Sequence, residues 1–99
     1  MNRLNEQKIE FCAALLSAMA NPARIKILTL LVQEEVPVST IALRLGSSQS
    51  VVSQHLAKLR NLNLVTTRRD AQTIYYYCQS SAVVALLQTL EKISFEFPN

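Results

Sequence analysis

The only glycine of this 99-residue chain, Gly46, separates two short amphipathic segments, and this arrangement limits the fold more than any other feature. On both sides of the glycine, mostly apolar residues recur at the spacing of one helical stripe. They are Val38, Ile41, Ala42 and Leu45 before it, and Val52, His55, Leu56 and Leu59 after it. Gly46 can adopt the left-handed conformation that ends a helix, and Ser48 or Ser47 can cap the next one. The stretch 39–60 therefore predicts a helix-turn-helix.

The second helix of this motif has a polar outer face. At about 100° per residue, the side opposite its apolar stripe holds small or hydrogen-bonding residues and no acid. They are Ser50, Gln54, Ala57 and Asn61, flanked by Val51, Ser53 and Lys58. Such a face suits the major groove of DNA, because small residues permit close approach, glutamine can pair with adenine, and lysine reaches phosphate or guanine.

Positive charge is concentrated in the same part of the chain. The whole chain carries a formal net charge of +3, but residues 44–70 alone carry +4, residues 1–43 are neutral, and residues 71–99 carry −1. The basic residues of the central segment are Arg44, Lys58, Arg60, Arg68 and Arg69. Clustering of this kind is typical of a nucleic-acid-binding surface. The alternative, a merely solubilising surface, usually mixes the two signs.

Three further helices are predicted outside the central motif. Their expected ranges are about 5–19, 22–35 and 80–94. The second begins with Asn21 as its cap and Pro22 as its first residue. Pro37 is expected to end that helix, and Ser39 or its neighbour to cap the one that follows. Arg24 and Lys26 lie away from the inferred DNA-reading helix and are expected to be solvated, with contact to flanking phosphates as the alternative.

A hairpin is predicted directly after the DNA-reading helix. Residues 64–69 and 72–78 are rich in β-branched and aromatic side chains, which favour strands. They can pair around Asp70-Ala71, and because no glycine is present the loop is expected to be slightly longer than two residues. A basic hairpin in this position is a wing, which contacts phosphates or the minor groove.

The first and last helices are more apolar than a single core-facing side requires. We therefore expect a two-fold homodimer in which these helices pack against their symmetry mates. The interface residues expected are Phe11, Leu15, Met19, Val83, Leu87 and Leu90. Two DNA-reading helices about 34 Å apart would then bind an inverted repeat. The length fits one domain, residues 1–99, and a partner is expected to complete the burial of its apolar surface.

Side chains suited to catalysis or metal binding are few and scattered. His55 is the only histidine and is expected to pack on the inward stripe. Cys12 and Cys78 lie far apart, without a CxxC motif or secretory signal, which favours a reducing, cytoplasmic setting. Cys12 is expected to be buried and Cys78 partly exposed, and a redox role for either thiol stays open as the less favoured alternative. No catalytic residue, cofactor, metal site or membrane span is predicted.

Three strings resemble the ArsR family of bacterial winged-helix repressors: AMANPARIKIL (18–28), SQSVVSQHLAKLR (48–60) and LVTTRRDAQTIYYY (64–77). The resemblance covers nearly the whole chain. It implies a mainly α fold with a small β-hairpin wing, in the order four helices, hairpin, fifth helix, forming a homodimer through the first and last helices and binding operator DNA. Carried over position by position, it places DNA contacts at Gln49, Ser50, Ser53, Gln54 and Lys58 of the DNA-reading helix and at Arg68, Arg69 and Gln72 of the wing.

Within that family the chain resembles the branch without a classical metal site. Metal-sensing members carry a cysteine motif on the first arm of the helix-turn-helix, or Asp and His ligands on the last helix. Residues 38–45 (VSTIALRL) and 81–93 (SAVVALLQTLEKI) contain neither Cys nor His. The cysteine pair of redox-sensing members corresponds to Thr29 and about Phe95. An inducing ligand, if there is one, is therefore unknown from the sequence.

The sequence thus predicts a bacterial, cytoplasmic regulator of transcription that binds double-stranded DNA and associates with the nucleoid when bound. A repressor at an inverted-repeat operator is favoured. Two alternatives remain, a winged-helix protein-interaction module that does not bind DNA and an activator that displaces another DNA-bound protein. An enzyme has little support, because the chain has no nucleophile beside a base, no paired carboxylates and no phosphate-binding glycine loop.

Overall fold

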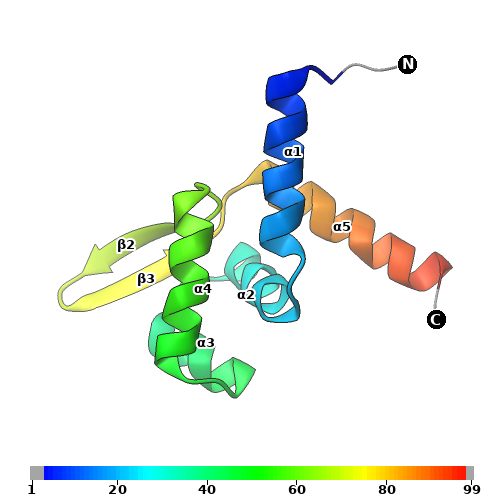
Figure 1. Cartoon of the computed structure of the whole chain (residues 1–99). Coiled ribbons are helices and arrows are strands. Elements are labelled where there is room, and N and C mark those ends of the chain that lie inside the picture. Colours follow the sequence, from blue (N-terminus) through cyan, green and yellow to red (C-terminus); the bar gives the residue numbers. More distant parts are fainter. Residues whose placement is uncertain (1–3, 98–99) are drawn as a thin grey trace.

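The computed structural model describes residues 4–97, which form five helices and three strands (Figure 1). In chain order these elements are α1 (Glu6–Met19), α2 (Pro22–Gln33), β1 (Val36–Pro37), α3 (Val38–Leu45), α4 (Gln49–Asn61), β2 (Thr66–Asp70), β3 (Thr73–Tyr77) and α5 (Ser81–Glu96). All of the predicted helices are present, with boundaries close to those expected. The helix-turn-helix is the pair α3 and α4, and the wing is the hairpin of β2 and β3.

Side chains cap the N-termini of four helices. In each case a side-chain oxygen accepts a hydrogen bond from the backbone N–H three residues later. The pairs are Asn5–Lys8 (2.9 Å), Asn21–Arg24 (3.1 Å), Ser48–Val51 (3.2 Å) and Ser80–Val83 (3.2 Å). Gly46 ends α3 with φ +64°, as its position predicted.

Helix α3 begins differently from the other helices. It follows Pro37 directly, and no side chain caps it, so the prediction that Ser39 or its neighbour would do so is wrong. Helix α2 ends at Gln33, two residues earlier than expected, because Glu34 is already extended (φ −155°, ψ 157°). The chain then enters a short strand and leaves it as a helix, with no loop in which a cap residue could lie.

That short strand, β1, was not predicted, and it makes the sheet three-stranded. The strands are antiparallel in the order β1-β3-β2, with Val36 opposite Tyr76 and Pro37 opposite Tyr75. On the other side of β3, the hairpin register places Asp70 opposite Thr73. The central strand of the sheet is therefore β3, and the wing is continuous with the connection between α2 and α3.

The loop at the wing tip contains only Ala71 and Gln72, so the expected longer loop is wrong. Ala71 makes the short loop possible by adopting φ +57°, a left-handed conformation that usually requires glycine. Strand β2 also starts two residues later than predicted. Leu64 and Val65, 5% and 3% exposed, belong to the hydrophobic core instead.

The core is formed around α2, which contacts α1, α3, α5 and β3. Its largest fully buried side chains come from the predicted apolar stripes of α2, the helix-turn-helix and α5. They are Ile27, Leu28, Leu31, Ile41, Val52, Leu56, Leu59 and Val83. Because both helices of the helix-turn-helix contribute to this cluster, hydrophobic burial fixes the orientation of α4.

Helices α1 and α5 project from this core, and α5 lies on the side opposite the wing (Figure 1). Both expose large apolar side chains: Phe11 is 55% exposed, Leu16 57%, Leu90 37% and Phe95 80%. No single helix within residues 4–97 is long and apolar enough to span a membrane. Helices α1 and α2 meet that test only as a pair, by length and composition, and the pair is bent by 99°.

Three expectations about burial need correction. Met19 and Val83, both predicted to lie in a dimer interface, are 3% and 0% exposed within one chain, so they belong to the core of the protomer. Cys78 is 5% exposed rather than partly exposed, and its backbone N–H donates to the Leu31 carbonyl at 3.0 Å. Cys12, expected to be buried, is partly exposed on α1.

Candidate nucleic-acid interface

The outer face of α4 is exposed along its whole length. Every residue assigned to this face from the sequence is accessible to solvent: Ser50, Val51, Ser53, Gln54, Ala57, Lys58 and Asn61. On the opposite side of the helix, Val52, Leu56 and Leu59 are at most 1% exposed. The burial pattern therefore turns the acid-free face outward.

The residues predicted to contact bases lie in the N-terminal part of α4. Gln49 and Ser50 begin the helix, directly after the Ser48 cap, and Ser53 and Gln54 follow one turn later. In helix-turn-helix proteins, the N-terminal residues of the second helix contact base edges in the major groove. Glutamine offers a donor and an acceptor together, which matches the edge of adenine.

Arg24 connects α4 to the corner between α1 and α2. Its guanidinium donates from Nε to the Ala18 carbonyl (2.5 Å) and from Nη2 to the Ser17 carbonyl (3.3 Å). Its Nη1 lies 3.4 Å from Nδ1 of His55, the inward histidine of α4. The expectation that Arg24 is solvated is therefore wrong. Local sequence patterns do not predict this contact, because Arg24 and His55 are 31 positions apart.

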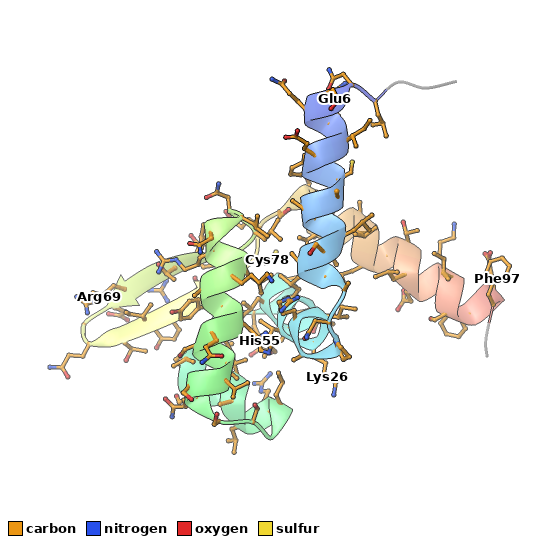
Figure 2. All side chains as sticks on the ribbon, viewed as in Figure 1. Glu6, Lys26, His55, Arg69, Cys78 and Phe97 are labelled. Atoms are coloured by element: carbon orange, nitrogen blue, oxygen red, sulfur yellow. The ribbon has the colours of Figure 1, made fainter. Side chains whose placement is uncertain are left out.

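His55 suits this contact as a neutral ring. Burial lowers its pKa, and the nearby positive charges of Arg24 and Lys58 lower it further. With the ring proton on Nε2, Nδ1 is free to accept from Arg24. His55 thus has the packed structural role that its position on the inward stripe predicted. Figure 2 shows it on α4, on the side of the α2 helix.

The two adjacent arginines of the wing have different surroundings. Arg68 forms a bidentate ion pair with Glu35: its Nη2 lies 2.9 Å from Oε1, and its Nε lies 3.2 Å from both carboxylate oxygens. Its Cζ also lies 4.8 Å from the centre of the Tyr75 ring. Hydrogen bonding to Arg68 lowers the pKa of Glu35, so the carboxylate is charged at neutral pH. Arg69, labelled in Figure 2, forms no ion pair with any of the described residues.

A second ion pair links the helix-turn-helix to the same part of the chain. Arg44 of α3 donates from Nη1 and Nη2 to the two carboxylate oxygens of Glu34, at 3.0 and 3.2 Å. Glu34 and Glu35, which follow α2, therefore neutralise two of the five basic residues of the segment 44–70. The basic residues of this segment that form no ion pair within residues 4–97 are Lys58, Arg60 and Arg69.

Among the described residues, no group of three His, Cys, Asp or Glu side chains could hold a metal ion. Burial raises the pKa of the Cys78 thiol, which disfavours the reactive thiolate.

A helix-turn-helix with an exposed, acid-free second helix, followed by a basic β-hairpin, defines a winged-helix DNA-binding protein. Residues 21–67 match the family described as bacterial regulatory protein, arsR family. The chain is 57% identical over 84 residues to the nodulation protein NolR of Rhizobium meliloti, covering 85% of this chain and 69% of that protein. It is 43% identical over 94 residues to the transcriptional activator HlyU of Vibrio cholerae serotype O1, covering 91% and 87%.

Solved structures of similar proteins indicate the same family. The crystal structure of NolR from Sinorhizobium fredii matches with a TM-score of 0.84 at 52% identity, over 94% of this chain and 96% of that one. A homodimeric winged helix-turn-helix domain from Mycobacterium bovis matches with a TM-score of 0.81 at 28% identity, over 100% and 94%. The chain belongs to the ArsR family, whose members are DNA-binding regulators of transcription and not enzymes.

Proposed function

We propose that this chain is a transcriptional repressor that binds an inverted-repeat operator as a homodimer. The observation that carries the proposal is the exposed, acid-free face of α4, held outward by a fully buried stripe on the same helix. A single domain would then both bind DNA and dimerise. The protein would act in the bacterial cytoplasm, on nucleoid DNA.

The proposed dimer interface consists of the apolar side chains that α1 and α5 leave exposed or half-buried. From the predicted set, Phe11 and Leu15 of α1 and Leu87 and Leu90 of α5 remain available, whereas Met19 and Val83 do not. The homodimeric state of the related domain from Mycobacterium bovis supports this arrangement. A two-fold axis through α1 and α5 would present two copies of α4 to one face of a DNA duplex.

The proposed contacts divide into two classes. Gln49, Ser50, Ser53 and Gln54 would contact base edges and set sequence preference. Lys58 of α4 and Arg69 of the wing, which form no ion pair within residues 4–97, would contact phosphates and set affinity. Gln72, in the loop at the wing tip, is proposed to join them.

The proposal also concerns whether this protein represses or activates transcription. The related biofilm growth-associated repressor of Agrobacterium fabrum is 33% identical over 88 residues, whereas HlyU is named an activator. We favour repression, because a repressor needs only to cover promoter DNA, whereas direct activation also needs a surface that contacts RNA polymerase. An activator that displaces another DNA-bound protein is the alternative.

Selection of binding sites from random duplex DNA tests the proposal. The purified protein is incubated with the library at low salt, and its oligomeric state is measured in the same buffer. Recovery of an inverted repeat by a dimer is expected. A folded dimer that enriches no sequence would overturn the proposal and favour a protein-interaction module.

Transcription in vitro from a promoter that contains the recovered site then separates the two directions. A repressor lowers transcript yield when polymerase and this protein are the only proteins present. A displacing activator raises the yield only after a competing DNA-bound protein has been added.

A further inference from the structure

The connection between α2 and α3 reaches the wing across the whole sheet. In the strand register, Pro37 of β1 lies opposite Tyr75 of β3, and Tyr75 lies opposite Arg68 of β2. Glu35 precedes Pro37 by two residues, so the alternation of side chains along a strand places both on the same face. On that face the Glu35 carboxylate binds the Arg68 guanidinium, which also lies over the Tyr75 ring.

Two groups from different parts of the chain, the Glu35 carboxylate and the Tyr75 ring, therefore meet at the Arg68 guanidinium. The two-oxygen contact with Glu35 fixes the plane of the guanidinium, and the ring of Tyr75 lies under it. Glu35 itself lies two residues after Gln33, the last residue of α2, and α2 is the central helix of the core. Arg68 lies on β2, the strand at the opposite edge of the sheet from β1. Its contact with Glu35 thus joins β2 to the segment that follows α2.

Arg69 has the opposite situation, although it is the next residue. It lies opposite Ile74, on the other face of the hairpin, and it forms no ion pair within the described part of the chain. A cation without a partner releases counterions when it meets a phosphate, whereas a cation already neutralised by a carboxylate releases few.

We propose that Arg68 is a positioning residue, held by Glu35 to set the orientation of the wing, and that Arg69 alone of the two arginines contacts the DNA phosphates. This inference rests on the proposed DNA-binding function and assigns its wing residues. Glu35 is then a residue of the DNA-binding machinery that touches no DNA.

The salt dependence of DNA binding distinguishes the two roles. Affinity for the selected site and for a random duplex of equal length is measured between 50 and 200 mM salt for the wild type, Arg69→Ala and Arg68→Ala. Arg69→Ala is expected to reduce the slope of log K against log salt by about one on both duplexes. Arg68→Ala is expected to leave the slope unchanged and to weaken binding to the selected site by about two- to fivefold. A slope reduced equally by both substitutions would overturn the proposal.

Exchange of the charges provides the second test, because the double variant keeps the net charge of the wild type. Arg68→Glu alone is expected to lose most binding through repulsion and the unpaired Glu35. The exchange Glu35→Arg with Arg68→Glu is expected to regain at least tenfold over Arg68→Glu, since the ion pair across the sheet can form again. An exchange variant that binds no better than Arg68→Glu would show that DNA requires a cation at position 68, and would overturn the proposal.

Thermal unfolding of every variant establishes that differences in binding do not come from loss of the fold. The wild type is the reference for the function itself. If it bound neither duplex at low salt, the DNA-binding proposal would fall, and this inference with it. Failure of the inference alone would appear as normal wild-type binding with equal slopes for the two arginine variants.

Discussion

The two elements proposed to face DNA, α4 and the wing, are attached to the protein by different sets of physical interactions. Val52, Leu56 and Leu59 attach α4 through side chains that are at most 1% exposed. The wing is attached through backbone pairing, through Tyr76 of β3, which packs against the core, and through an ion pair whose side chains, Arg68 and Glu35, are 47% and 42% exposed. The orientation of α4 therefore depends on hydrophobic burial, and that of the wing depends in part on exposed charge.

This difference implies that the two elements respond differently to solution conditions. Burial of apolar surface changes little with moderate salt, whereas exposed charges are screened over about 8 Å at physiological ionic strength. We therefore expect α4 to keep its orientation as the salt concentration varies and the wing to adjust. Four substitutions or conditions test the comparison.

The largest effect is expected at the attachment of α4. Leu56→Ala removes a side chain that is 1% exposed and should lower the free energy of unfolding by about 2–5 kcal/mol, because it leaves a cavity in the core. Urea unfolding at a fixed protein concentration measures the change. Val51→Ala, at a 42% exposed position of the same helix, is the matched control and should change stability by about 0.5 kcal/mol or less. Equal effects of the two substitutions would contradict the conclusion that α4 is attached through its buried side.

The next effect concerns recognition and not stability. Gln54→Ala should weaken binding to the selected site by about 1–3 kcal/mol and relax specificity at one position of each half-site, because a base edge loses its partner. Binding is measured against the site and its single-base variants. An equal loss on random DNA would remove Gln54 from the base-reading group.

The pH dependence of stability should differ between the two regions. The pKa of His55 is lowered from 6.5, so the unfolded chain binds a proton more readily than the folded one, and stability falls as pH drops below about 6.5. The pKa of Glu35 is lowered from 4.5, so its contribution persists above about 4.5 and is lost only as pH falls through the folded pKa. Urea midpoints between pH 8 and 5 should therefore fall for the wild type and fall less for His55→Gln. Identical profiles for both proteins would contradict the role of His55, whereas Glu35→Gln is expected to follow the wild type over this range.

The smallest effect is expected at the wing tip. Ala71 adopts φ +57°, which costs a residue with a Cβ about 1 kcal/mol. Ala71→Gly should raise the free energy of unfolding by up to about 1 kcal/mol, since glycine adopts this conformation without strain. The same replacement at exposed Ala57, inside α4, should lower it by about 1 kcal/mol. A loss of stability at both positions would show that the turn is not strained.

Features determined by neighbouring residues could be predicted from the sequence. The end of α3 at Gly46 and the cap at Ser48 each depend on a few adjacent residues, so local chemistry was enough. The buried stripe of α4 could be predicted because helical periodicity repeats over three turns. The same periodicity identified its outer face, which the structure exposes.

Features that depend on residues far apart in sequence could not be predicted. Strand β1 has only two residues, one of them proline, and so it carries no alternation to detect. The ion pairs of Arg44 and Arg68 join residues 10 and 33 positions apart, and nothing local distinguishes Arg68 from Arg69. The conformation of Ala71 follows from the hairpin register and not from its own preference.

The brevity of β1 has a consequence for how the length of this chain can change. Only two residue pairs join β1 to β3, and Glu35 precedes them directly. One residue inserted between Glu35 and Val36 would turn Glu35 to the opposite face of the sheet, away from Arg68, because side chains alternate along a strand. Insertions and deletions are therefore the changes that this connection tolerates least, even though Glu34 and Glu35 are exposed and could be substituted without disturbing the core.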